Sequence, residues 1–148
     1  LAISSDHADV AVGGASAGGL SAACTALAHP EVFGNVLSES GAFWRSPRAF
    51  PEEEWLASFI SKWKHEPVRF FISIGTLEND SAFGTGMISM LHANRHLRDV
   101  LLARGYDVSY LEITGAHDPL NWERALPEAL RLLFGANGAK SEQRNRLE

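Results

Sequence analysis

The chain has 148 residues, of which 45% are hydrophobic and 21% are charged, and its formal net charge is −5 at pH 7. This composition is typical of a folded globular domain and excludes a disordered or fibrous chain. A basic footprint for nucleic acid is absent, and the apolar runs are too short to cross a bilayer. We therefore expect one folded domain that binds neither nucleic acid nor a membrane.

Four short apolar runs, each bounded by Gly, Pro, Asp or Glu, are typical of buried strands. They are DVAVGG from residue 9, GNVLSE from 34, RFFISIG from 69 and DVSYLEI from 107. Four stretches with helical features alternate with them, namely GGLSAACTALAH, EEEWLASFISKW, MISMLHANRHLRDVLLARG and WERALPEALRLLFG. Gly105 is expected to end the third helix, and Pro127 is expected to kink the fourth or divide it in two.

The alternation of strands and helices predicts an α/β fold with a mainly parallel sheet and helices on both faces. We assign residues 1–135 to this domain and residues 136–148 to a polar tail, whose final Leu-Glu is interpreted as a cloning scar. Ligands of such sheets bind at the carboxyl ends of the strands. The residues that directly follow each strand are therefore the candidates for function.

The first predicted strand runs into GGASAGG, where Ser16 fits the pattern G-x-S-x-G. A nucleophilic serine on a sharp strand-to-helix turn needs small neighbours, because the backbone is strained and the flanking elements pack closely. The free N–H groups at the start of the next helix can stabilise an oxyanion. The alternative is a glycine-rich turn or phosphate loop in which Ser16 caps the helix, although the lysine of a phosphate loop is missing.

A serine nucleophile needs a base, and His117 lies in the loop after the last predicted strand. The acid that orients such a histidine is expected after the preceding strand, where Glu78 and Asp80 stand. We favour Glu78, with Asp80 as the alternative and Asp118 as a weaker candidate, because adjacent residues rarely face each other. The other interpretation is that Glu78 and Asp80 are both solvated acids in a turn. The order serine, acid, histidine is that of α/β hydrolases.

The segment GAFWRSPRAF follows the second strand, and it contains the candidates for substrate binding. Trp44 can stack on an aromatic acyl group, and Arg45 and Arg48 can meet an anionic substrate. The alternative is that Trp44 covers the core and that the arginines are solvated loop charges.

Three further side chains are assigned structural roles and not functional ones. His92 and His96 have the spacing of two metal ligands, but Ala93 stands where the motif H-E-x-x-H has its glutamate, so we favour a surface helix face. Cys24, the single cysteine, is expected to be a packing residue. No metal and no organic cofactor is implied. We expect a cytoplasmic protein, with a periplasmic or secreted location left open.

The segments GASAGGLSAACTALAHPEVFGNVLSESGAFW, IGTLENDS and GAHDPLNWERAL together resemble the esterase branch of the α/β hydrolases. This branch includes the enterochelin (ferric siderophore) esterases and, more distantly, feruloyl and S-formylglutathione esterases. The resemblance covers residues 9–134 and implies the three-layer αβα sandwich of the α/β-hydrolase fold. It implies Ser16 as nucleophile, His117 as base and Glu78 as acid. The implied substrate is a small-molecule ester, either a siderophore lactone or an aromatic acyl ester.

In this family several strands precede the one that carries the nucleophile, whereas here Ser16 follows the first predicted strand. The resemblance therefore implies that the N-terminal strands of the domain are missing, together with the loop that gives the second oxyanion N–H. The N–H of Ala17 is the donor that this chain offers. The missing N-terminal half is then an expected partner. The rival interpretation is a non-catalytic α/β-hydrolase-like module, or an inactive fragment that serves in binding or assembly.

Overall fold

The computed structural model describes residues 4–46, 52–79 and 89–135, and strands alternate with helices along this chain. The strands are β1 (Ala11–Ala15), β2 (Asn35–Glu39), β3 (Arg69–Gly75) and β4 (Val108–Ile113). The helices are α1 (Ala17–Ala28), α2 (Trp55–Lys62), α3 (Met90–Ala103) and α4 (Pro119–Phe134), and a short 3-10 helix, η1 (His7–Asp9), precedes β1. In the described part of the chain, no helix is both long enough and apolar enough to span a membrane.

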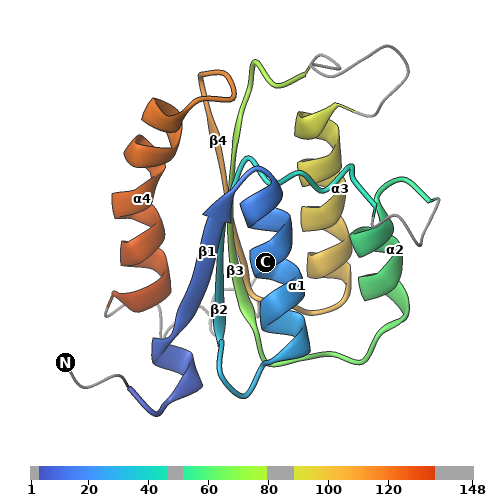
Figure 1. The fold of residues 1–148 in the computed structure, drawn as a ribbon, viewed down its shortest axis with the longest axis vertical. Coiled ribbons are helices and arrows are strands. Elements are labelled where there is room, and N and C mark those ends of the chain that lie inside the picture. The colour runs from blue at the N-terminus through green and yellow to red at the C-terminus, as the bar shows by residue number, and fades with distance from the viewer. Residues whose placement is uncertain (1–3, 47–51, 80–88, 136–148) are drawn as a thin grey trace, which may run out of the picture.

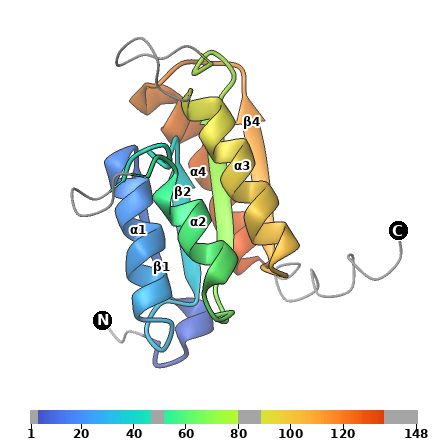
Figure 2. The same ribbon diagram turned by 90° about the vertical axis from the view of Figure 1, so that its right-hand side faces the viewer.

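The four strands form one parallel sheet in which they lie in chain order, β1-β2-β3-β4. Helices α1, α2 and α3 stand side by side on one face of this sheet, and α4 returns across the other face (Figures 1 and 2). The fold is therefore the three-layer α/β arrangement that the sequence predicts. The carboxyl ends of the strands meet at the top of Figure 1, where α1 and α4 both begin.

The face covered by α1, α2 and α3 holds the larger hydrophobic core. Successive strand residues point to opposite faces, so Phe70 and Ile72 of β3 reach this core while Phe71 reaches the other face. On α3, Leu97 and Leu101 are completely buried against this side of the sheet. Burial of a side chain of this size contributes about 1.5–3 kcal/mol, so this face supplies most of the hydrophobic stabilisation.

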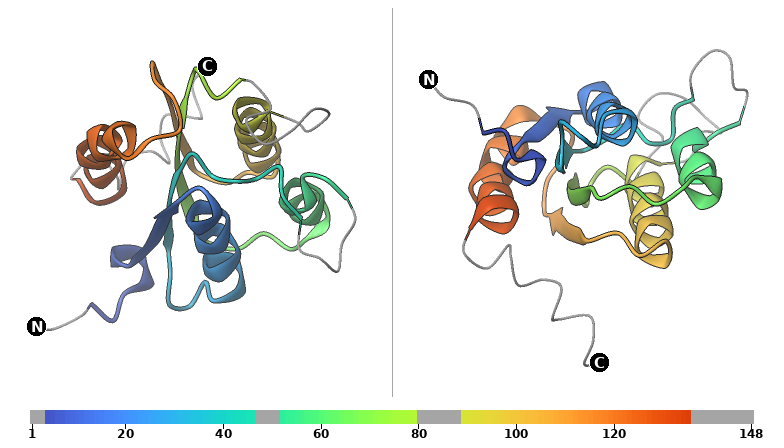
Figure 3. Two further views of the ribbon diagram at one scale, coloured as in Figure 1. Left: turned by 45° about the horizontal axis from the view of Figure 1, so that its top comes forward. Right: turned by 90° about the horizontal axis from the view of Figure 1, so that it is seen from below.

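The face covered by α4 is smaller and less complete. Its core consists of Leu37, Phe71, Ala129 and Leu133. Helix α4 packs over β2, β3 and β4, and Figure 3 shows it on the side of the sheet opposite α1, α2 and α3. Three large side chains spaced four residues apart on α4 are 41–46% exposed, and we call them the α4 stripe: Leu126, Leu130 and Phe134.

Helix α4 differs from its prediction at its start and in its middle. It begins at Pro119, before the predicted start at Trp122, because the Asp118 carboxylate accepts the N–H groups of Leu120 at 3.0 Å and Asn121 at 3.2 Å. Asp followed by Pro is a favoured helix start, since proline has no N–H that needs a partner there. Pro127 lies inside α4 and does not divide it in two. The helix stays whole because its buried residues on either side of Pro127 pack against the sheet.

Candidate active site

Ser16 occupies the sharp turn between β1 and α1. Its φ is 55° and its ψ is −121°, a conformation that costs a residue with a side chain about 1–3 kcal/mol. The turn is held by hydrogen bonds from the Ser16 N–H to the Glu39 carbonyl and from the Ala42 N–H to the Ser16 carbonyl, both of 2.9 Å. The Ser16 side chain makes no capping hydrogen bond to α1, so the structure does not support the alternative capping role.

Two of the glycines around Ser16 allow close packing of helix against strand. A Cβ atom at Gly14 would lie 2.7 Å from the carbonyl carbon of Gly18 at the start of α1. A Cβ atom at Gly19 would overlap the hydroxyl of Ser38 on β2. The small residues thus let α1 begin directly against the strands that carry the site. Ala17 is the first residue of α1, so its N–H has no acceptor within the helix and is suited to bind an oxyanion.

His117 and Glu78 form a pair at the same edge of the sheet. The distance from His117 Nδ1 to Glu78 Oε2 is 2.7 Å. Glu78 follows β3 and His117 follows the neighbouring strand β4, so adjacent loops bring them together. The Glu78 side chain is 3% exposed and that of His117 is 25% exposed. With Nδ1 donating to the carboxylate, Nε2 is the ring nitrogen that can accept a proton.

The second oxygen of Glu78 is also bonded. Its Oε1 accepts hydrogen bonds from Ser40 Oγ at 2.7 Å and from the Gly75 N–H at 2.9 Å. Trp122 Nε1 donates to the same Ser40 hydroxyl at 3.1 Å, and its ring lies edge-on to His117 with centroids 5.2 Å apart. Glu78, His117, Ser40 and Trp122 thus form one connected cluster. The sequence analysis missed the role of Ser40, although its place directly after β2 is a signal that could have found it.

The other candidate acids do not compete for His117 in the described structure. Both carboxylate oxygens of Asp118 serve α4, since Oδ1 caps the helix start and Oδ2 accepts from the Asn121 side chain at 2.8 Å. Asp80 lies outside the described residues. Of the candidates that can be compared, Glu78 is the one placed against His117.

The predicted substrate-binding residues follow β2 at the catalytic edge. Trp44 is half-buried and packs both against the large core and against a smaller cluster of buried residues that contains Ile74 and Met90. The exposed Arg45 places its guanidinium carbon 5.5 Å from the centre of the Trp44 ring. Arg48 lies outside the described residues. Trp44 therefore covers part of the core, as the alternative interpretation held, and its role in substrate binding stays a prediction.

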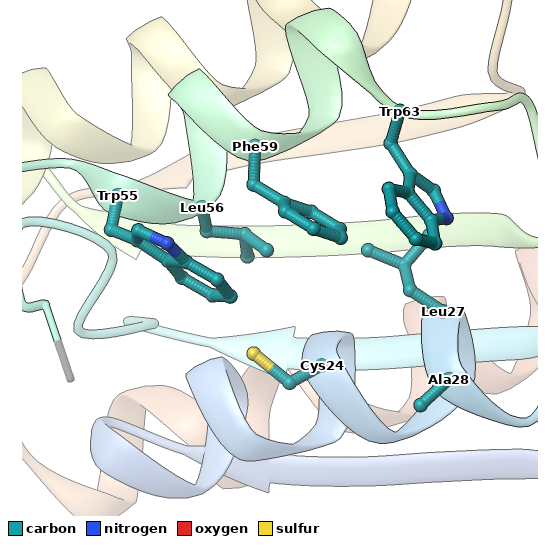
Figure 4. Close-up of a pocket in the computed structure, with 7 residues that line it drawn as sticks. All are labelled: Cys24, Leu27, Ala28, Trp55, Leu56, Phe59 and Trp63. Carbon is teal, nitrogen blue, oxygen red and sulfur yellow. The ribbon is translucent and has the colours of Figure 1, made fainter. Parts of the chain in front are cut away.

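The weaker candidates take structural positions. His92 Nδ1 lies 3.0 Å from Ser89 Oγ, and His96 Nδ1 lies 3.0 Å from Glu54 Oε1. The described residues contain no cluster of three or more potential metal ligands. Cys24 is half-buried, and burial raises the pKa of its thiol. It lines an apolar pocket of about 200 Å³ between α1 and α2, whose other walls include Phe59 and Trp63 (Figure 4).

Glu39, the last residue of β2, was not singled out from the sequence. It is 9% exposed, and burial raises the pKa of its carboxyl to about 7. Its Oε1 atom has no hydrogen-bond partner among the described residues. Because its backbone carbonyl accepts the N–H of Ser16, this buried acid adjoins the turn that carries the candidate nucleophile.

Comparison with known proteins gives consistent findings for sequence and fold. The family model described as "Putative esterase" matches residues 2–133. The iron(III) enterobactin esterase of Dickeya dadantii is 30% identical over an alignment that covers 98% of this chain. The enterobactin esterase of Shigella flexneri, crystallised in the presence of enterobactin, matches 88% of this chain with a TM-score of 0.73 and 29% identity. A ferulic acid esterase at 19% identity, with a TM-score of 0.66 over 87% of this chain, shares the fold.

The matches cover most of this chain but only about a third of each enterobactin esterase. The chain spans 34% of the Dickeya dadantii protein and 32% of the Shigella flexneri protein. It therefore corresponds to about a third of the length of these enterobactin esterases.

Proposed function

The chain belongs to the esterase family whose model matches residues 2–133, and from this premise we propose that it carries the catalytic triad of a serine carboxylic-ester hydrolase. The observation that carries the proposal is the Glu78–His117 pair, 2.7 Å apart, at the sheet edge where Ser16 forms the strained turn after β1. A histidine with one nitrogen held by a buried carboxylate is suited to take a proton from a serine hydroxyl.

In the proposed reaction, Ser16 Oγ attacks the ester carbonyl carbon while His117 Nε2 takes the hydroxyl proton. The Ala17 N–H stabilises the negative oxygen of the tetrahedral intermediate. The carbon–oxygen bond to the alcohol then breaks, and His117 gives its proton to the leaving alkoxide. Water attacks the acyl-enzyme in the same way, with His117 as base, and releases the acid and free Ser16. Glu78 keeps His117 oriented and stabilises its cationic form.

The proposed substrate class is a siderophore lactone or an aromatic acyl ester. The support comes from relatives named as enterobactin and salmochelin esterases at about 30% identity. Trp44 and Arg45 follow β2 at the edge of the sheet where Ser16 lies, and we propose that they contact the acyl part of the substrate. A half-buried tryptophan offers a flat face to an aromatic ring, and an exposed arginine attracts anionic groups.

We also propose that this chain acts as the C-terminal part of a larger catalytic domain. Two surface features support this, in addition to the one-third coverage of the relatives. The α4 stripe is exposed, and no strand among the described residues pairs with the outer edge of β1. Both are surfaces that proteins usually cover. The additional part would supply the second oxyanion donor. The cytoplasmic location expected from the sequence stays a prediction.

The experiment that tests the proposed function is covalent labelling by a fluorophosphonate, followed by intact mass measurement. The 148-residue chain and the longest natural polypeptide that contains it are compared, each with its Ser16→Ala and Ser21→Ala variants. We expect one label per molecule on the longer polypeptide, lost in Ser16→Ala and kept in Ser21→Ala, because Ser21 is an exposed helical serine bonded to the Ala17 carbonyl. Absence of label on both wild-type polypeptides would favour the rival non-catalytic module.

A further inference from the structure

Glu39 is a buried acid whose carboxyl group is not fully hydrogen-bonded among the described residues. It is 9% exposed, and its Oε1 has no hydrogen-bond partner among the described residues. Its neighbours in the sheet register are Ala15 of β1 and Ser73 of β3, neither of which carries a charge. Buried polar side chains in native proteins nearly always have a partner, because leaving one unpaired is costly. The position of Glu39 therefore calls for a hydrogen-bond donor.

The Glu39 side chain lies on the α4 side of the sheet. Alternate residues of a strand share a face, and Leu37, two residues earlier, packs there against Phe71 and Ala129. Helix α4 covers β2, β3 and β4 on this side, whereas Gly13 in the middle of β1 is exposed. The side of Glu39 that faces β1 is thus the part of its surroundings that the described residues leave incomplete.

We propose that Glu39 is a positioning residue of the esterase site: in the complete protein its carboxyl accepts a hydrogen bond from a further segment of the same polypeptide, which lies over β1 on the α4 side. This inference rests on the proposed function. The occupant we assign is a part of the protein outside these 148 residues. The open edge of β1, the α4 stripe and the one-third coverage of the relatives favour it over a second copy of this chain.

Glu39 then fixes that segment beside the nucleophile. Its backbone carbonyl already accepts the Ser16 N–H at 2.9 Å, so the same residue would hold the nucleophile turn through its main chain and the incoming segment through its side chain. A segment held at this point would lie beside the nucleophile turn, and we assign to it the second N–H group that stabilises the oxyanion. We assign a neutral donor to this segment, for which a glutamine at position 39 would be an adequate acceptor.

The test compares wild-type protein with three variants of the longest natural polypeptide. Glu39→Gln keeps an acceptor oxygen, Glu39→Leu fills similar space without one, and Glu39→Ala removes the group. With p-nitrophenyl butyrate as probe, we expect Glu39→Leu and Glu39→Ala to lower kcat by about 10- to 100-fold, somewhat less than loss of an oxyanion donor. The KM should change little, and Glu39→Gln should keep kcat within about threefold of wild type.

Two further measurements distinguish a failure of this inference from a failure of the proposed function. Fluorophosphonate labelling reports whether Ser16 is activated, and it should still reach completion in all three variants. Hydrogen–deuterium exchange, which needs no activity, should show faster exchange in Glu39→Ala for β1 and for the segment that covers it. The inference is overturned if Glu39→Leu and Glu39→Ala exchange as wild type does, if Glu39→Gln loses as much kcat as Glu39→Ala, or if protection depends on protein concentration, which would indicate a second copy.

Discussion

On the β3–β4 side of the catalytic edge, Glu78 uses both of its carboxyl oxygens, and His117 and Ser40 complete the cluster with it. On the β1–β2 side, Ser16 stands on a strained turn and Glu39 Oε1 has no partner among the described residues. The residues that we propose for proton transfer thus come from loops within this chain. For the nucleophile and the oxyanion, we propose that further contacts come from outside these residues. We call the β3–β4 part of the edge, where both Glu78 oxygens are hydrogen-bonded, the finished side, and the β1–β2 part the unfinished side.

The largest expected effect comes from the finished side. Glu78→Gln keeps the shape of the side chain but removes its charge, so His117 loses the group that orients it and stabilises its cation. We expect kcat of the longest natural polypeptide to fall by about 10³- to 10⁴-fold, since neutralising the acid of other triads costs about 10⁴-fold. Steady-state kinetics with p-nitrophenyl butyrate measures this.

The matched control for that substitution is Asp80→Asn, which neutralises the alternative acid of the sequence analysis. We expect this variant to keep kcat within about twofold, since the observed pair is Glu78 with His117. If Asp80→Asn lowers kcat as much as Glu78→Gln does, then Asp80 also takes part in orienting His117.

A smaller effect is expected on the unfinished side, as a pH dependence of stability. Burial raises the pKa of Glu39 from its ordinary value of 4.5 to about 7, so the folded chain holds a proton that the unfolded chain releases. Stability from this group is fully present below pH 4.5 and is lost as the pH rises to about 7. A shift of this size corresponds to about 3 kcal/mol at most.

Urea unfolding of the 148-residue chain and its Glu39→Gln variant at pH 5 and pH 8 measures this dependence. We expect the wild type to lose stability relative to Glu39→Gln at the higher pH, since the other titrating groups cancel in the difference. If the difference in unfolding free energy between wild type and Glu39→Gln is the same at pH 5 and pH 8, the raised pKa of Glu39 is wrong. We propose that Glu39 has a donor in the longer polypeptide, so we expect a smaller change there than in the 148-residue chain.

The smallest expected effect is that of Ser40→Ala, which removes the hydroxyl donor to Glu78 and the acceptor of Trp122. A net contribution of about 1 kcal/mol for such a hydrogen bond predicts a fall in kcat of about fivefold with little change in KM. Ser61→Ala on α2, where the hydroxyl bonds only the Ser58 carbonyl among the described residues, is the matched control. Wild-type kcat in Ser40→Ala would mean that the Ser40 hydroxyl does not help to position Glu78 for catalysis.

The sequence predicted those parts of the fold and site that depend on local pattern. The bounds of β3 were predicted to the residue, since its apolar side chains follow the charged Arg69 and end at Gly75. Ser16, Glu78 and His117 could be selected because each lies shortly after a strand. Ser40 and Glu39 could not, because their roles depend on contacts with residues distant in sequence and on burial that a serine and a glutamate do not signal. The early start of α4 could have been predicted from the sequence, because Asp118 followed by Pro119 is a recognisable helix start.

The strict chain order of the four strands has a consequence for how this protein could be divided. No strand is inserted between two others, so each internal row of sheet hydrogen bonds is formed entirely by residues of this chain. If, as we propose, this chain is the C-terminal part of a larger domain, and the next strand of that domain pairs with β1, a cut immediately before β1 breaks one row of strand–strand hydrogen bonds. Two separately expressed pieces would then need to re-form only that row within the sheet, with β1 as the strand at which they rejoin.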